Sequence, residues 1–328
     1  MTTRRKLLIA IGTGLLVLPF SSRAQKTAKT SHIGYLSAGT VETNDAFLAA
    51  LRDGLRELGY IDGKNIVIDV RWAGDAAYLF PQMAASLVQD KPSAIVTTCI
   101  PSTRAAKNAT GTIPVVMSVD GDPVNAGLVA SLARPGGNVT GEWTLFDELI
   151  LKWVELLHIA TPNVRDVAVL FNPDNLLDPY WSAQFEEAAQ RVGVKAVRFE
   201  ARKPADLDRA FADMKTKNAG GLVINVEAFL ASQVQHIVSL ADRYRLPAVY
   251  GFREFTDAGG LMSYGVSFRD YYKRVARYVD LVLKGAKPAD LPVERPTKIE
   301  LIINLAAARK LGVNIPPQLL VRADEVIQ

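Results

Sequence analysis

The sequence predicts an α/β protein made of two doubly wound parallel-sheet lobes. From Ser31 onward, short apolar runs rich in branched residues alternate with longer segments of helical period, the pattern of βαβ units and a parallel sheet. The second half of the chain also repeats the order and spacing of the first half. A chain of 328 residues is long enough for two domains of ordinary size, so each half is expected to form one lobe.

The first lobe begins with an expected strand at 32–36. Residues 44–58 follow as an amphipathic helix, because their apolar residues recur at helical spacing and Gly59 is placed to end the helix. Three further strands, with helices between them, are expected at 66–72, 94–98 and 114–119.

The repeat pairs four strands of the first half with four strands of the second half. Each later strand lies 128 to 135 residues after its counterpart. The pairs are 32–36 with 167–171, 66–70 with 195–199, 94–98 with 222–226, and 113–116 with 246–249. The same order at similar spacing predicts two lobes of the same topology.

The chain is expected to cross between the lobes more than once. A joint is predicted near 134–138, followed by a short strand at 139–141 and a helix at 147–160 that begins the second lobe. A helix at 268–284 and a strand at 300–303 lie beyond the repeat, so a return crossing is expected there. The predicted division is a signal peptide at 1–24, a first lobe at 31–141 plus about 266–291, and a second lobe at 142–265 plus about 292–328.

The N-terminus has the three parts of a cleavable signal peptide. Residues 3–6 supply a basic segment, residues 7–20 supply an apolar segment, and small residues precede an expected cleavage after Ala24. The apolar stretch is too short for a permanent membrane anchor. Arg4 and Arg5 also fit a twin-arginine signal, so export by the Sec or the twin-arginine route stays open. The predicted destination is the periplasm.

Removal of the signal peptide changes the charge of the chain. The whole sequence has 38 basic and 34 acidic residues, and four basic residues but no acidic one lie within 1–24. A mature chain with equal numbers of both has no electrostatic footprint for nucleic acid or an anionic membrane. The single cysteine, Cys99, excludes an internal disulfide.

The ligand site is expected in the cleft between the lobes, at the carboxyl ends of the parallel strands. These ends carry hydroxyls, amides, carboxylates and aromatic rings. The candidate binding residues are Ser37, Thr40, Thr98, Ser102, Asp120 and Asp122 in the first lobe, and Asn172, Asn225, Glu227, Tyr250 and Phe252 in the second.

These side chains predict binding of a small polar ligand that also has an apolar or aromatic part. Hydroxyls and free N–H groups suit a ligand carboxylate, whereas Asp120 or Glu227 suits an ammonium group. An aromatic part is expected against Phe171, Tyr250 or Phe252. Structural explanations stay open for several candidates, which are capping of a helix at 124–132 by Asp122, a turn at Asn172, and lobe packing by Tyr250 and Phe252.

Catalysis and metal binding have little support in the sequence. The three histidines are expected on a strand start and on helices, away from the strand ends, so no metal site is predicted. Cys99 alone is placed like a nucleophile, at a strand-to-helix turn, but no histidine is expected beside it. No phosphate-binding loop occurs, and no cofactor is predicted. A Cys99-dependent hydrolase remains the less favoured alternative.

Specific strings resemble one known family. GDPV at 121–124, AGLV at 126–129, SLARPGGNVTG at 131–141, AGGLMSYG at 258–265, IPP at 315–317 and RADEV at 322–326 are similar to ABC-transporter substrate-binding proteins, a family with aromatic-amino-acid-binding members. The resemblance implies a type I periplasmic binding fold with three crossovers between its lobes. Many relatives have an apolar residue where this chain has Asp120, which makes Asp120 the most distinctive candidate for ligand selectivity.

The function that the resemblance implies is that of a periplasmic solute-binding component of an ABC importer. Such a protein, expected to be a monomer, captures a small molecule and delivers it to a membrane permease driven by an ATPase. An amino acid or an aromatic or apolar carboxylate is the expected ligand. A ligand-sensing subunit for a receptor kinase is the alternative from a different class.

Overall fold

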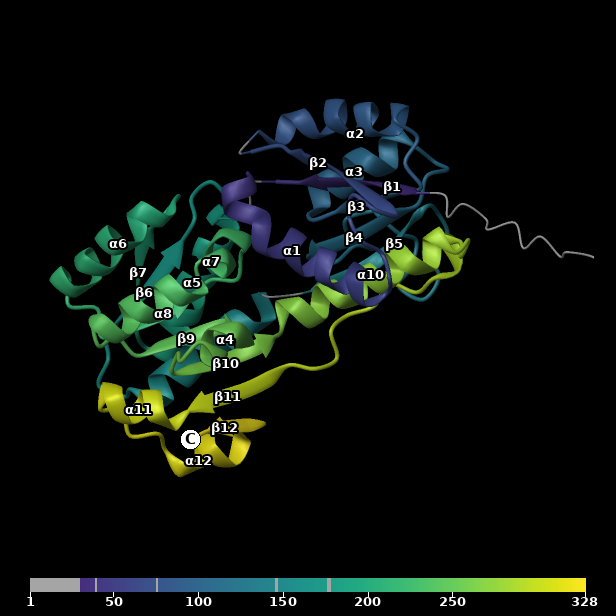
Figure 1. Ribbon diagram of the computed structural model, residues 1–328. Coiled ribbons are helices and arrows are strands. Elements are labelled where there is room, and N and C mark those ends of the chain that lie inside the picture. Colours follow the sequence, from purple (N-terminus) through teal and green to yellow (C-terminus); the bar gives the residue numbers. More distant parts are fainter. Residues whose placement is uncertain (1–29, 39, 75, 145–146, 176–177) are drawn as a thin grey trace, which may run out of the picture.

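The protein folds into two α/β lobes that lie side by side (Figure 1). The computed structural model describes residues 30–328 except 39, 75, 145–146 and 176–177. The predicted signal peptide lies outside the described residues. Each lobe is built on a largely parallel sheet covered by helices, so the predicted fold class is confirmed. In the described part of the chain, no helix has both the length and the apolar character needed to cross a membrane.

The sheet of the first lobe has the order β2-β1-β3-β4-β5, and all its strands are parallel. Its strands are rich in branched apolar residues, and every residue of β3 is buried, as expected where helices cover both faces of a parallel sheet. The strands are β1 (Ser31–Ser37), β2 (Ile66–Trp72), β3 (Ala94–Thr97), β4 (Val115–Asp120) and β5 (Val139–Thr144). The helices are α1 (Val41–Glu57), the short 3₁₀ helix η1 (Ala77–Leu79), α2 (Phe80–Gln89) and α3 (Ile100–Ala109).

The sheet of the second lobe has the order β7-β6-β8-β9-β10-β11-β12. Its first five positions repeat the order of the first sheet, which confirms the internal repeat. The strands are β6 (Asp166–Phe171), β7 (Lys195–Glu200), β8 (Gly221–Ile224), β9 (Ala248–Phe252), β10 (Met262–Val266), β11 (Glu300–Asn304) and β12 (Glu325–Ile327). The repeat did not predict one feature, which is that β11 pairs antiparallel with β10.

The helices of the second lobe cover both faces of its sheet, with the C-terminal elements gathered at one edge (yellow in Figure 1). They are α4 (Asp147–Ala160), α5 (Asp178–Val192), α6 (Pro204–Thr216), α7 (Ala228–Ser232), α8 (Val234–Arg243), α9 (Arg253–Asp257), α11 (Leu305–Leu311) and α12 (Pro317–Arg322). Trp153 of α4 is fully buried and donates a hydrogen bond to the Tyr264 carbonyl at 2.6 Å, which fixes α4 to β10.

Helix α10 (Phe268–Leu283) belongs to the first lobe although it follows β10 of the second. It packs against α1 and against β3, β4 and β5. The 3₁₀ helix η2 (Pro288–Asp290) follows, and the chain then returns to the second lobe at β11. The chain therefore crosses between the lobes three times, from β5 to α4, from β10 to α10 and from η2 to β11. Two of them are joined by backbone hydrogen bonds, from Glu294 to Gly141 at 3.1 Å and from Trp143 to Glu294 at 3.0 Å.

Two predicted elements differ from the structure. The short strand expected at 139–141 continues to Thr144 as β5. The helix expected at 124–132 is wrong, because this segment forms a series of turns. Gly127 adopts a left-handed φ of 68°, which an α-helix does not allow. The predicted boundaries between the lobes stay a prediction.

Candidate ligand-binding cavity between the lobes

A cavity of about 490 Å³ lies between the lobes, at the carboxyl ends of the central strands. Both lobes and α10 contribute to its wall. The lining residues are Ala38, Thr40, Phe47, Gly74, Thr98, Cys99, Ile100, Pro101, Ser118, Val119, Asp120, Thr144, Asn172, Asp174, Asn175, Trp181, Val226, Glu227, Ala228, Phe252, Val266, Phe268, Tyr271 and Tyr272. A cavity of this volume accommodates a small molecule and lies where parallel sheets usually bind one.

Six of the eleven predicted site residues line this cavity. They are Thr40, Thr98, Asp120, Asn172, Glu227 and Phe252. All six end a strand or lie in the loop after one. The carboxyl ends of the strands converge at the cavity, which explains this agreement. Their role in binding stays a prediction.

The three remaining candidates of the first lobe lie outside the cavity wall. Ser37 is buried, and its hydroxyl shares a hydrogen bond of 2.8 Å with the Thr98 hydroxyl. Ser102 is fully buried and donates to the Cys99 carbonyl at 2.9 Å, at the start of α3. Asp122 accepts hydrogen bonds from the backbone N–H groups of Val124 and Asn125, so it stabilises a turn. These side chains support the wall from behind or beside it.

The two remaining candidates of the second lobe are buried in that lobe. Asn225 is buried, and its side chain accepts a hydrogen bond from the Val226 N–H. Tyr250 stacks on Phe255 with ring centroids 4.7 Å apart, so lobe packing explains this tyrosine. Phe171, also expected to contact the ligand, packs edge-on against Phe185 and does not line the cavity.

The aromatic part of the wall comes mainly from helices, whereas the predicted site was limited to residues at the carboxyl ends of strands. Phe47 on α1, Trp181 on α5 and Phe268, Tyr271 and Tyr272 on α10 line the cavity together with Phe252. The ring of Phe47 stacks on Tyr272 at 5.1 Å and meets Phe252 of the other lobe at 6.2 Å. The amphipathic periodicity of α1 and α10 was visible in the sequence, but it does not distinguish a face packed in a lobe from a face at the cleft.

The charged part of the wall is entirely acidic. Asp120, Asp174 and Glu227 line the cavity, and none of the described lining residues is Lys, Arg or His. Asp120 lies at the end of β4, where its carboxylate and the Thr144 hydroxyl on β5 are 3.2 Å apart. Asp174 pairs with Arg202 at 3.3 Å. The cavity therefore favours a ligand with a positively charged group over one with only negative charge.

Glu227 is the most deeply buried of the three acids. Its carboxylate accepts hydrogen bonds from the N–H groups of Leu230 at 2.6 Å and Phe229 at 3.2 Å, and so caps α7. The Asn172 amide lies 3.4 Å from the same carboxylate. Burial raises the pKa of Glu227 to about 7 in spite of these hydrogen bonds. A ligand ammonium group beside Glu227 would favour the charged form of this side chain.

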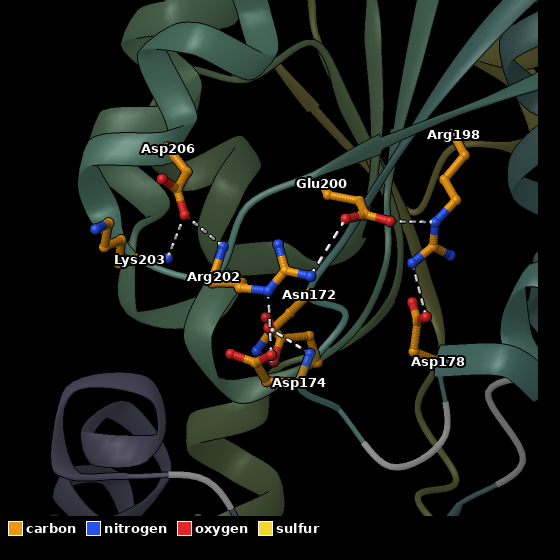
Figure 2. Close-up of polar contacts among 9 residues, drawn as sticks. Asn172, Asp174, Asp178, Arg198, Glu200, Arg202, Lys203 and Asp206 are labelled. Carbon is orange, nitrogen blue, oxygen red and sulfur yellow. Dashed lines mark hydrogen bonds and ion pairs between the residues drawn. The ribbon is translucent and has the colours of Figure 1, made fainter. Parts of the chain in front are cut away.

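A row of ion pairs holds the loop between β6 and α5, which carries three lining residues (Figure 2). Arg198 and Glu200 of β7 pair at 2.9 Å, and Arg198 also pairs with Asp178 at 2.7 Å. At the other end of the row, Arg202 joins Glu200 and Asp174. The Arg198 guanidinium lies 4.6 Å from the Phe171 ring centroid, so this arginine is fixed on both sides.

The family of the protein follows from comparison with known proteins. Residues 41–327 match the family of ABC transporter substrate binding proteins. The chain belongs to this family. Its members are solute-binding proteins rather than enzymes; they bind small molecules, interact with an ABC permease and are typically extracytoplasmic. The resemblance found in the sequence motifs is confirmed.

Three relatives of this ABC transporter substrate-binding protein are similar over most of the chain. A tyrosine-binding protein of Clostridioides difficile (strain R20291) is 28% identical over 258 residues, which cover 79% of this chain and 73% of the relative. A conserved domain protein from Vibrio cholerae is 30% identical with a TM-score of 0.70, over 91% of this chain and all of the other. A Streptococcus pneumoniae ABC domain in complex with L-Trp is 27% identical with a TM-score of 0.68, over the same shares.

The environment of Cys99 agrees with a structural role in this family. Its sulfur lies 3.3 Å from the Ser102 hydroxyl at the start of α3. Burial raises the pKa of the thiol, which is the opposite of what a nucleophile needs. None of the three histidines lines the cavity. The described residues also contain no group of His, Cys, Asp and Glu side chains arranged to hold a metal ion.

Proposed function

We propose that this protein is the periplasmic solute-binding component of an ABC importer and that it captures an amino acid with an aromatic or apolar side chain. The mature protein begins after cleavage behind Ala24 and acts as a monomer. It holds its ligand between the two lobes and delivers it to a membrane permease driven by an ATPase.

The observation that carries this proposal is a cavity, shared by both lobes, that combines aromatic rings with acids and has no basic side chain among its described lining residues. The aromatic rings suit an aromatic or apolar side chain. Asp120 from one lobe and Glu227 from the other suit an ammonium group, while the Thr98 hydroxyl and the Ile100 N–H at the start of α3 suit a carboxylate. The relatives named for tyrosine binding and solved with L-Trp support the same class of ligand.

The energies of these interactions are sufficient for tight capture. Micromolar affinity corresponds to about −8 kcal/mol. A charge-assisted hydrogen bond contributes roughly 1.5–3 kcal/mol. Burial of about 150–250 Å² of an aromatic ring adds roughly 4–6 kcal/mol before the entropy of binding is subtracted. Because the entropy lost on association is subtracted from these contributions, the polar contacts need the burial of the aromatic part beside them.

A thermal-shift screen of the mature protein tests the ligand class. The panel contains the twenty amino acids and matched aromatic acids and amines that lack either the ammonium or the carboxylate. A ligand at about 100 times its Kd adds about 2.7 kcal/mol to the free energy of unfolding, so aromatic amino acids are expected to raise the melting temperature by several degrees. Stabilisation by the aromatic acids without an amine, and not by the amino acids, would contradict the proposal.

A further inference from the structure

Thr144 lies opposite Asp120 at the carboxyl ends of two neighbouring strands, and both residues line the cavity. Strands β4 and β5 run parallel, and their register pairs Asp120 with Thr144. The Gly121 N–H also donates a hydrogen bond to the Thr144 carbonyl at 2.8 Å, so the backbone pairing continues past the end of β4. The backbones that carry the two side chains are therefore fixed relative to each other.

The hydroxyl of Thr144 is placed to orient the Asp120 carboxylate. Its Oγ1 lies 3.2 Å from Oδ1 of Asp120 and 3.5 Å from the Val119 carbonyl oxygen. A hydroxyl has one proton to donate, and an ionised carboxylate is a stronger acceptor than a neutral carbonyl, so the proton goes to the nearer Asp120. Thr144 is 5% exposed, and its β-branched side chain has few rotamers, so this donor is itself held in place.

Thr144 orients the charge of Asp120 without neutralising it. A lysine or arginine in this position would compensate the carboxylate, but none of the described lining residues is basic. Asp120 is only partly buried. An ionised carboxylate has about four acceptor sites, so one hydrogen bond from a neutral hydroxyl leaves both charge and acceptor capacity for a ligand ammonium group. A carboxylate that is already oriented loses less entropy when the ligand binds.

We propose that Thr144 is a positioning residue for amino-acid capture, because its hydroxyl holds the Asp120 carboxylate in the orientation that accepts the ligand's ammonium group. The proposal rests on the proposed function, since it concerns the ammonium end of a ligand in the same cavity.

The test compares L-tyrosine with 3-(4-hydroxyphenyl)propionate, which lacks only the ammonium group, in the wild type and in Thr144→Val. Valine keeps the branched shape and removes the hydroxyl. Isothermal titration, with competition for weak binding, is expected to show a loss of about three- to tenfold in affinity for tyrosine and of less than about twofold for the deaminated acid. Thr144→Ser restores the hydroxyl and should bind both ligands like the wild type.

A double-mutant cycle with Asp120→Asn needs tyrosine alone. Once the charge at Asp120 is removed, Thr144→Val is expected to weaken tyrosine binding by less than about twofold further. A loss as large as in the wild-type background would show that Thr144 does not act through Asp120. Thermal unfolding shows whether each variant is folded, and Thr144→Ala removes the same hydroxyl where the valine variant does not fold.

Thr140→Val is the matched control. Thr140 lies on the same strand, is fully buried and donates a hydrogen bond to the Leu291 carbonyl at 2.8 Å, but it does not line the cavity. This variant is expected to leave both affinities unchanged. An equal loss for the two ligands in Thr144→Val, no loss for either, or a serine variant that behaves like the valine variant would overturn the inference alone. Failure of the wild-type protein to bind any amino acid would overturn the proposed function together with the inference.

Discussion

At the scale of single residues, Glu227 connects local structure with the chemistry of the cavity. It caps α7 through two backbone N–H groups and lines the cavity at the same time. Burial raises its pKa to about 7, so near neutral pH the ligand-free protein contains both forms. Because the raised pKa is that of the folded state, the stability that Glu227 contributes is fully present below its unfolded pKa and is lost as the pH rises through about 7.

The same pKa predicts a pH dependence of ligand binding. An ammonium group favours the charged carboxylate, so binding releases a proton from Glu227 below about pH 7. The affinity for an aromatic amino acid is therefore expected to fall by up to about tenfold per pH unit as the pH drops from 7 to 5. Titration calorimetry in two buffers of different ionisation enthalpy measures the released proton directly.

The control for this pH dependence is a second buried carboxyl outside the cavity. Glu254 accepts a hydrogen bond from the Ser267 hydroxyl at 2.7 Å, its pKa is also raised by burial, and it does not line the cavity. Glu227→Gln should lose the proton release, whereas Glu254→Gln should keep it. Proton release that survives in Glu227→Gln would show that another group titrates.

At the scale of elements, the strands could be predicted because each strand of a parallel sheet buried on both faces is a nearly continuous run of apolar residues. These runs alternate with helical segments along the chain. The predicted strands at 66–72 and 94–98 agree with β2 and β3 to within one residue. The segment at 124–132 failed because Gly127 adopts a left-handed conformation inside an apparently helical pattern. The amino-acid composition of this segment does not predict the left-handed conformation of Gly127.

The site could be predicted only where it depends on strand ends. Tyr250 and Phe252 lie two residues apart on one strand and share a face, but only Phe252, the last residue of β9, reaches the cavity. The aromatic residues of α1 and α10 were missed although 266–291 was assigned to the first lobe, because the predicted site was limited to the ends of strands. Spacing along a helix identifies its apolar face and not the partner of that face.

The row of ion pairs that begins at Arg198 and ends at Arg202 leads to a prediction about ligand binding. Arg198→Met is expected to weaken ligand binding by about three- to tenfold, because it leaves the buried Asp178 without its partner at the start of α5. Arg202→Met is expected to change affinity less than about twofold, since Arg202 and Asp174 are both about half exposed. Dissociation constants of both variants for one amino acid provide the measurement. Equal effects of the two substitutions would contradict this account of the row.

At the scale of the whole molecule, the repeat, the crossovers and the cavity form one arrangement. The sheets of the two lobes share the order of five strands and present their strand ends to each other, and three crossovers keep the lobes joined on one side. Buried Glu142 of β5 pairs with Arg274 of α10 at 3.1 Å. This ion pair lies beside the backbone hydrogen bonds that join β5 to Glu294, in the crossover from η2 to β11. The joint is thus fixed by a few specific contacts, while the cavity wall draws its acids from both lobes.

The measurement that tests this account most directly is a calorimetric titration of L-tyrosine and L-tryptophan into the mature protein and its Asp120→Asn, Glu227→Gln double variant. We expect the wild type to bind one ligand per chain at micromolar affinity or tighter, and the double variant to lose affinity by at least about 100-fold. Glu254→Gln should bind like the wild type. Unchanged affinity in the double variant, or no binding of either amino acid to the wild type, would contradict the account.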